Sequence, residues 1–483
     1  MKHHKLGLDQ AHAGASVLSR TIKSVLALGL LVGGANIAQA QVSPAPSTPS
    51  EKQATAEGLT WHGITLYGII DVGLQYDTHG APFSDYYPAG SADIVQKNSR
   101  QSVEGLTPSN LSQSRIGLQG AEPLGVADVE GVFRLETFFN PQSGDISDGP
   151  KSQVLNNGRA TGSQTTNLDS SVAGEAFEIA YAGVASKTFG SLTFGRQNTL
   201  LTDGISKYDP NYSSQAFSLI GLSGTYAGGG DTEDKRLDDA VKYTLPIMGI
   251  AHVGALYKFN QSNGAAGTAW QADAGADYAG ASVDAYIAKT RDAISVSALS
   301  AAQVTGLPAL GYSVSNSLAG TISDNTAASL MGSYTSGPVK ILAGYEYIQY
   351  DNPKTPLPAG TYTIGGYNLA YVSNTAYPHP KILNVYWAGV RYTAMPGLDL
   401  TAAYYGYHQN SYGVGANAHC DTTVAGTCSG TFDGISFDAD YAFTKRFDAY
   451  LGAMYTTVYN GVANGYTFQR NNIDPTIGVR FKF

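Results

Sequence analysis

Charge, cysteine and long apolar segments are all scarce in this sequence of 483 residues. Only 14% of the residues are charged, and acidic residues outnumber basic ones by 38 to 29, which argues against nucleic acid as a partner. After residue 40 no apolar run is long enough to cross a bilayer as a helix. The mean hydropathy of −0.13 is that of a soluble protein, but it does not exclude a membrane barrel, because lipid-facing and lumen-facing residues alternate along each strand.

Recognised catalytic motifs are also missing. The sequence contains no G-x-S-x-G, H-E-x-x-H, G-x-x-x-x-G-K-[ST] or C-x-x-C pattern. His408 and His419, even combined with the two cysteines, do not have a recognised zinc spacing. We therefore expect no enzyme, no cofactor and no metal. One enzymatic alternative stays open, a membrane-barrel hydrolase with His408 as its base near the outer rim.

The first 40 residues have the form of a secretory signal. A basic stretch precedes an apolar run over residues 24–38, and the triplet Ala38, Gln39, Ala40 matches an A-x-A cleavage site. The run is too short to span a bilayer. We predict a signal peptide at residues 1–40, a flexible Pro/Ser-rich segment at 41–60 and a barrel domain at 61–483.

Hydrophobic and polar residues alternate in the segment 63–76, GITLYGIIDVGLQY, which predicts a strand with one apolar face. The same two-residue period recurs sixteen times. The predicted strands are 63–76, 113–121, 126–139, 176–189, 191–198, 236–246, 249–260, 268–279, 281–291, 326–336, 338–350, 381–394, 398–410, 431–443, 447–459 and 474–483.

The connections between these segments alternate between short and long. Short turns are expected at 121–125, 189–191, 246–249, 279–280, 336–338, 394–397 and 444–446, and long polar loops elsewhere. This alternation and the even strand count are typical of a single-chain outer-membrane barrel, with turns in the periplasm and loops outside. The fold prediction is thus an all-β, sixteen-stranded antiparallel transmembrane barrel, wide enough for an aqueous channel.

A soluble sandwich, propeller or solenoid is the alternative. Aromatic residues at the predicted strand ends favour the membrane barrel, because such a barrel has amphipathic rings at both membrane interfaces, and no internal repeat of fixed period is visible. These aromatic residues are Tyr76, Phe139, Phe189, Phe259, Tyr278, Tyr392, Phe443 and Phe447.

Four stretches resemble the general porins of Gram-negative bacteria, in particular the β-proteobacterial type. They are GITLYGIIDVGLQY, SRIGLQGAEPLG followed by VFRLETFFN, SLTFGRQN, and the closing TIGVRFKF. The resemblance implies a homotrimer in outer-membrane lipid and lipopolysaccharide, with loop 3 folded into each lumen. It also implies that the C-terminal Phe483 is recognised by the outer-membrane assembly machinery. The long first loop and the Pro-rich start depart from the pattern.

The strand alternation directs several charged side chains into the lumen. Arg115, Arg134 and Glu136 are predicted to form a constriction wall, with Asp71 on the first strand. Family porins place loop 3 acids opposite wall arginines, and loop 3 here, at about 199–235, offers Asp203, Asp209, Asp231, Glu233 and Asp234. Opposed charges in a narrow wet gap sort solutes by sign and size. Each of these charges has an alternative role as a solvated wall or loop residue.

Two further predictions concern single residues. Arg196 would face lipid by strict alternation, so we expect it near the rim or after a bulge that reverses the alternation. Cys420 and Cys428 lie in one long loop in an oxidising compartment, which predicts a local disulfide.

Together these features predict a passive diffusion pore for small hydrophilic solutes and ions in the bacterial outer membrane. A substrate-selective channel and a barrel serving mainly as an adhesin or receptor remain alternatives.

Overall fold

The computed structural model describes residues 59–79, 102–142, 144, 146, 151–159, 177–223, 236–259, 267–360, 362–364, 366–415, 418, 426–463 and 470–483. The predicted signal peptide therefore lies outside the described residues, and so do Asp231, Glu233, Asp234 and Cys420.

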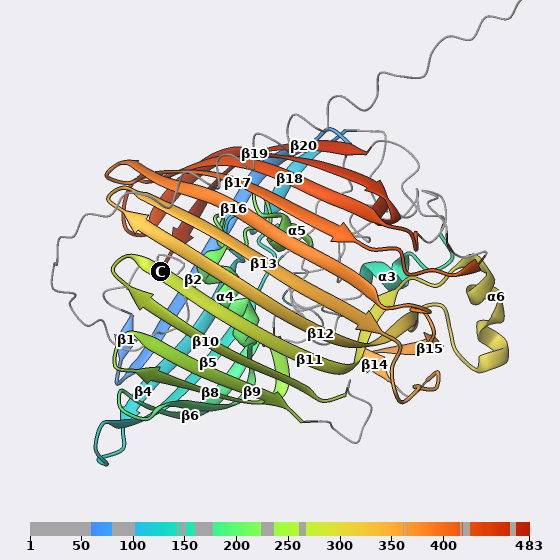
Figure 1. The fold of residues 1–483 in the computed structure, drawn as a ribbon, viewed down its shortest axis with the longest axis horizontal. Helices are drawn as coiled ribbons and strands as arrows, with labels where there is room; N and C mark the ends of the chain where they lie inside the picture. Colours follow the sequence, from blue (N-terminus) through green and yellow to red (C-terminus); the bar gives the residue numbers. More distant parts are fainter. Residues whose placement is uncertain are drawn as a thin grey trace, which may run out of the picture. The chain divides into compact units, whose positions relative to one another are not determined.

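Sixteen long antiparallel strands of the described chain form one closed barrel (Figure 1). They are β2 (Ile64–Asp77), β4 (Arg115–Pro123), β5 (Val129–Phe138), β6 (Ile179–Ser186), β7 (Gly190–Asn198), β8 (Arg236–Ile247), β9 (Ala251–Lys258), β10 (Ala269–Tyr278), β11 (Ala281–Ser297), β12 (Ser317–Ser336), β13 (Val339–Asp351), β16 (Lys381–Met395), β17 (Leu398–Gln409), β18 (Gly430–Ala442), β19 (Phe447–Asn460) and β20 (Asn471–Lys482). Each predicted strand corresponds to one of them.

The first and last barrel strands close the ring. β2 pairs with β20, for example Ile70 with Phe481, and it pairs with β4 on its other side. Phe483 extends the closure, because its N–H donates to the Gly68 carbonyl at 3.0 Å and its carbonyl accepts from the Gly68 N–H at 2.9 Å. No strand edge of the barrel is left unpaired along this seam, as a barrel in lipid requires.

Four shorter strands and several helices complete the described structure. The strands are β1 (Thr60–Trp61), β3 (Val103–Pro108), β14 (Thr363–Ile364) and β15 (Tyr367–Ser373). The helices are α3 (Lys151–Leu155), α4 (Leu200–Tyr208), α5 (Leu219–Ser223), α6 (Ala301–Leu310) and the 3-10 helix η3 (Gly461–Ala463). None of the described helices has the length and apolar character needed to cross a membrane.

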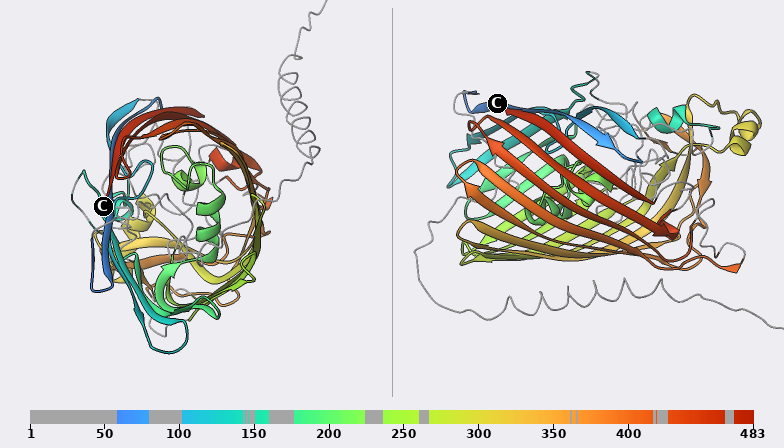
Figure 2. Two further views of the ribbon diagram at one scale, coloured as in Figure 1. Left: turned by 90° about the vertical axis from the view of Figure 1, so that its left-hand side faces the viewer. Right: turned by 90° about the horizontal axis from the view of Figure 1, so that it is seen from above.

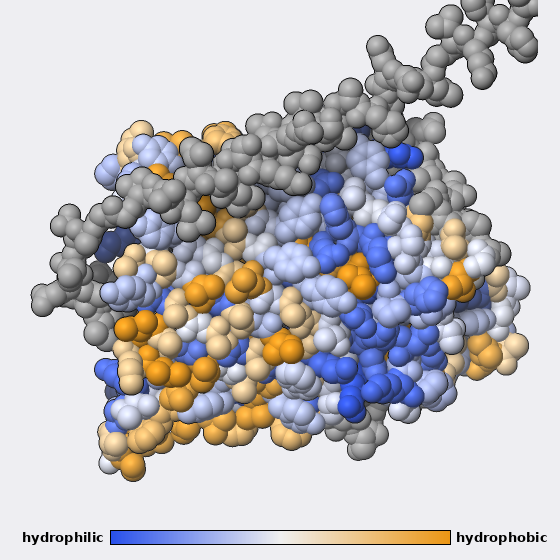
Figure 3. All heavy atoms as spheres, viewed as in Figure 1, coloured by the Kyte–Doolittle hydropathy of each residue, from blue (hydrophilic) through white to orange (hydrophobic). Residues whose placement is uncertain are grey.

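The outward-facing side chains separate into an apolar band and a polar band. Exposed apolar residues such as Leu330, Ile341, Leu451 and Ile477 occupy the half of the wall near the short turns. Figure 3 shows this apolar region on one side of the molecule and a hydrophilic region nearer the long loops. Because exposed apolar side chains belong in lipid, the apolar band indicates the part of the wall that faces the membrane.

Aromatic rings border the apolar band, as the sequence predicts. Tyr76, Phe189, Phe259, Tyr278, Tyr392, Phe443 and Phe447 are all exposed on the described surface. Phe139 is only partly exposed.

The tight turns depend on residues that accept positive φ. Ala279 and Gly280 join β10 to β11 with φ of 50° and 82°, which matches the hairpin turn whose twist suits antiparallel strands. Met248 and Gly249 repeat the pattern between β8 and β9.

Two strands are longer than predicted. β11 continues to Ser297 and β12 begins at Ser317, beyond the expected limits of 291 and 326. β15 pairs with this extension in parallel, and Ile294, Leu318 and Leu369 form a small apolar core there. Successive residues of β12 from Ser317 to Ala327 are buried or half-buried, so both faces of the extension are covered and its sequence does not show the alternation that marks a half-exposed strand.

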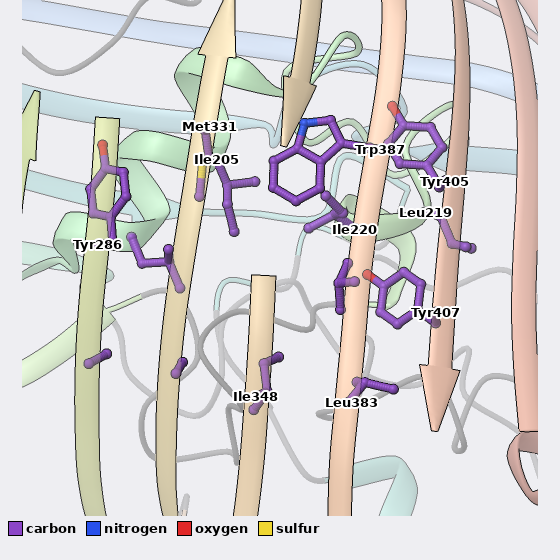
Figure 4. Packing of buried hydrophobic residues seen from close by; sticks show 14 of the residues in the cluster. Ile205, Leu219, Ile220, Tyr286, Met331, Ile348, Leu383, Trp387, Tyr405 and Tyr407 are labelled. Atoms are coloured by element: carbon purple, nitrogen blue, oxygen red, sulfur yellow. The ribbon is translucent and has the colours of Figure 1, made fainter. Parts of the chain in front are cut away.

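Inside the ring of strands lie α4 and α5 (Figure 2, left). Their apolar residues pack against side chains on the inner face of β11–β17, including Tyr286, Met331, Trp387 and Tyr405 (Figure 4). Thr199 caps α4 by accepting a hydrogen bond from the Thr202 N–H at 3.1 Å. This apolar contact fixes the segment after β7 against one side of the inner wall.

Candidate pore constriction

A network of one carboxylate, two guanidinium groups and one phenol lies on the inner face of β2, β4 and β5. Glu136 Oε2 lies 2.7 Å from Nη2 of Arg134 and 3.6 Å from Nε of Arg115. The Tyr67 hydroxyl donates to the same oxygen at 2.8 Å and accepts from Nε of Arg134 at 2.7 Å. The structure therefore brings together three of the four predicted wall residues.

A second carboxylate extends this network along the wall. Glu178, directly before β6, lies 3.0 Å from Nη1 of Arg236 and 3.5 Å from Nη2 of Arg196. Arg236 also stacks over the ring of Phe138, with 4.4 Å from its Cζ to the ring centroid. We call Arg115, Arg134, Arg196 and Arg236, with Glu136 and Glu178, the basic wall.

Arg196 reaches the basic wall through a β-bulge. The register of β7 against β8 shifts between Gly195 and Gln197, and Gly195 adopts a φ of 123° that L-residues rarely accept. A bulge reverses the alternation of the residues that follow it. Arg196 lies within this irregularity, so of the two alternatives predicted for it, the rim and a bulge, the structure shows the bulge.

Two residues of the basic wall were not singled out from the sequence. Glu178 lies inside the predicted strand 176–189, but β6 begins only at Ile179, so Glu178 stands outside the regular alternation, and it is almost fully buried. Arg236 precedes an irregularity at Asp239, which has a φ of 49°. The sequence gives little indication of where these two side chains point, because the local backbone conformation, and not the two-residue alternation, determines their direction.

The loop after β7 supplies one acidic residue near the basic wall. Asp203 in the first turn of α4 forms an ion pair with Lys242 of β8 and accepts from Asn198 Nδ2 at 3.2 Å. Lys242 also donates to the Asn198 carbonyl at 3.1 Å. The base of the loop is thus held to the two strands that it connects.

Asp209, the other described acid of this loop, lies at the far side of α4 and is completely buried. It accepts from the Tyr405 hydroxyl at 2.6 Å, from the Ser218 hydroxyl, and from the N–H groups of Asn211 and Ser213 at 2.9 Å. Burial raises the pKa of the Asp209 carboxyl, and these hydrogen bonds partly oppose that effect. The carboxyl group therefore holds the loop against β17.

Arg391 of β16 fastens the same segment. It donates to the backbone carbonyls of Asp209 and Pro210, and the neighbouring Trp387 donates from Nε1 to the Tyr208 carbonyl at 3.0 Å. The tip of the loop reaches further, because Phe217 packs in a T-shaped contact on Tyr450 of β19. Residues 199–217 are thus attached to β8, β16, β17 and β19.

Asp71 differs from the other predicted wall residues. It is fully buried, accepts from the N–H groups of Leu111 and Ser112 at 2.9 and 2.8 Å, and accepts from the Tyr450 hydroxyl at 2.5 Å. Through these hydrogen bonds, the Asp71 carboxylate holds the segment between β3 and β4 against the inner wall.

Two other predicted residues have defined positions. Cys428 is disulfide-bonded. His408, at the outer end of β17, faces outward, and its Nε2 lies 2.8 Å from the Tyr386 hydroxyl.

The closed barrel, its apolar outer band and the charged inner wall define an outer-membrane channel. The model of the Gram-negative porin family matches residues 26–461, and the chain belongs to that family. It is an outer-membrane porin, a channel for the diffusion of small solutes. No curated protein matches the chain in sequence.

Several solved structures share the fold. The anion-selective porin from Comamonas acidovorans is 17% identical, with a TM-score of 0.56 over 87% of this chain and 99% of that chain. OmpT of Vibrio cholerae is 14% identical, with a TM-score of 0.51 over 89% and 100% of the two chains. The outer-membrane channel DcaP of Acinetobacter baumannii is 14% identical, with a TM-score of 0.51 over 87% and 97%.

Proposed function

We propose that this porin passes small hydrophilic solutes and ions passively, and that the basic wall gives it a preference for anions. Four arginines share two carboxylates among the described residues of this wall. A surplus of fixed positive charge in a narrow aqueous gap raises the local concentration of anions.

The main support for this proposal is the difference in exposure between the arginine and carboxylate side chains. The carboxylate side chains of Glu136 and Glu178 are 1% and 3% exposed, whereas those of Arg115 and Arg196 are 13% and 17% exposed. Solutes in the lumen therefore contact guanidinium groups in front of the carboxylates. The name of the Comamonas porin, anion-selective, supports the same sign of selectivity.

The loop after β7 forms the opposite side of the gap in this proposal. Its contacts with β16, β17 and β19 attach it to the side of the ring away from β4–β7, so we infer that the basic wall is the part of the inner surface that faces it. We infer that this is loop 3 of the family and that it narrows the pore, with Asp203, Asp209, Asp231, Glu233 and Asp234 as its acids.

The remaining proposals concern assembly. A homotrimer is supported by the trimer form described for OmpT of Vibrio cholerae. We also propose that residues 1–40 are removed, that residues 41–60 form a flexible segment and that residues 61–483 form the barrel domain. In the same proposal the barrel contacts lipopolysaccharide, and the assembly machinery recognises Phe483. The channel works without catalysis or a cofactor.

Single-channel current in a planar bilayer under a potassium chloride gradient tests the basic wall. The variant R115A/R134A should shift the reversal potential toward cation preference, because it removes two of the four guanidinium groups. The matched control K445A/R446A also removes two positive charges, but in the turn between β18 and β19, and should leave the reversal potential unchanged. An equal reversal potential in all three proteins would overturn the site assignment.

A further inference from the structure

Lys381 lies at the extracellular end of the lumen with its ammonium group among tyrosine rings. Its Nζ is 5.1 Å from the ring centroid of Tyr350 and 5.9 Å from that of Tyr412. Tyr377 lies between these two rings, with centroid distances of 5.9 Å to Tyr350 and 5.8 Å to Tyr412. We call these four residues the tyrosine–lysine site.

The site faces inward. Lys381 is the first residue of β16, and Leu383, Val385 and Trp387, which share its side of the strand, are all buried inside the barrel. Lys381 is paired in register with Tyr350 of β13, whose side chain also points inward. Since the other end of β16 carries a short turn, this end opens toward the long loops.

The three rings come from separate segments: Tyr350 stands on β13, and hydrogen bonds fix the backbone of Tyr377 and of Tyr412. The side-chain amide of Asn352 bonds both the N–H and the carbonyl of Tyr377 at 2.9 Å. Tyr412 accepts from the His379 N–H at 3.2 Å and donates its own N–H to the Thr427 carbonyl at 2.8 Å. The site is therefore preorganised, which lowers the entropic cost of binding a ligand.

The ammonium group of Lys381 has no anionic partner within the described part of the chain. Its contacts there are with ring faces, and neither a carboxylate nor a hydrogen-bond acceptor lies within bonding distance. Asp351, the nearest acid in sequence to the site, faces outward and accepts from Gln349 Nε2 at 2.8 Å. Cation–π contact compensates only part of the hydration that a lysine loses, and all three N–H donors remain available to an anion.

We propose that the tyrosine–lysine site binds small organic anions that combine a carboxylate with a flat apolar body, before they reach the basic wall. The carboxylate accepts charge-assisted hydrogen bonds from Lys381, and the flat body packs against Tyr377 and Tyr412, both of which are partly exposed. The inference deepens the proposed function, since it presumes an anion-conducting pore and adds a selective step at its mouth.

Benzoate tests the site, with acetate as a probe of equal charge that lacks the ring. Each is added to the wild-type channel during single-channel recording in potassium chloride, and the interruptions of the chloride current are counted as a function of concentration. We expect saturable interruptions by benzoate at concentrations about ten-fold lower than for acetate, a difference of about 1.4 kcal/mol.

Three variants assign the effect to the site. K381M removes the charge and should raise the benzoate concentration needed for interruptions at least about ten-fold. K381R keeps the charge and should need nearly the wild-type concentration. K354M removes an exposed lysine from the loop after β13 and should behave as wild type. The conductance in potassium chloride alone shows that each variant is folded, and the reversal potential in the salt gradient shows that the basic wall still works.

Equal effects of benzoate and acetate would overturn the proposal, and so would benzoate interruptions that persist in K381M. A wild-type channel that prefers cations in the salt gradient would instead refute the proposed function. The two failures are thus distinguishable in one set of recordings.

Discussion

The guanidinium carbon of Arg391, on the inner face of β16, lies 3.3 Å from the centroid of the Tyr212 ring. The same guanidinium group bonds the backbone carbonyls of Asp209 and Pro210. One wall residue therefore holds both the backbone and a side chain of the segment inside the barrel.

Loss of Arg391 should loosen this segment. R391M removes two charge-assisted hydrogen bonds and the cation–π contact, each of which contributes about 1 to 3 kcal/mol in buried positions. We expect noisier single-channel currents with frequent brief closures. K340M is the control, because Lys340 also faces inward and is paired in register with Arg391 on the neighbouring strand. Equally quiet currents in both variants would show that Arg391 does not hold the segment.

Glu136 should matter to both stability and selectivity. E136Q leaves two arginines without their shared carboxylate, and breaking a buried ion pair costs about 3 to 5 kcal/mol. The midpoint of urea unfolding in detergent micelles should fall, while the reversal potential should move further toward anion preference. A shift toward cation preference would contradict the charge balance described for the basic wall.

The role of the bulge at Gly195 can be tested by adding a single methyl group to this glycine. In G195A the added Cβ would lie 2.3 Å from the Ala180 carbonyl oxygen, and the φ of 123° would be strained by about 1 to 3 kcal/mol. The strand should relax toward regular pairing and turn Arg196 away from Glu178, which would lower both folding yield and anion preference. G131A on β5 is the matched control, because its Cβ would meet its nearest neighbour at an ordinary 3.4 Å. Identical behaviour of the two variants would refute this role of the bulge.

Removal of Phe483 separates two roles of the last residue. Its backbone bonds Gly68, and its ring packs so closely that a Cβ on Gly68 would lie 2.3 Å from it. If the residue is also an assembly signal, deletion should reduce the folded protein in the outer membrane more strongly than it reduces refolding from urea into detergent. Equal losses in the two measurements would indicate a packing role alone.

Two-residue alternation was sufficient to predict every barrel strand, because lipid on one side and an aqueous lumen on the other impose opposite chemistry on successive residues. The signal fails where that contrast is absent. Ile294 and Leu318 belong to strand extensions that are covered on both faces, so they were assigned to a loop. The helix α6 within the same loop likewise gives no strand signal.

The candidate site was predicted less completely, for a related reason. Arg115, Arg134 and Glu136 lie on regular strands, so their shared face could be predicted. Tertiary contacts decide the rest: Asp71 is covered by residues 109–112, and Asp209 is covered by Tyr405 and Ser218. Nothing local to Asp71 or Asp209 distinguishes a buried carboxylate that holds a loop from one that lines a pore.

The seam between β2 and β20 has a consequence for synthesis. A barrel that loses β20 exposes two strand edges, on β2 and on β19, and cannot exclude lipid from either. A closed barrel therefore requires β20. Closure of the pore thus waits until β20, the final strand of the described chain, has been synthesised and exported.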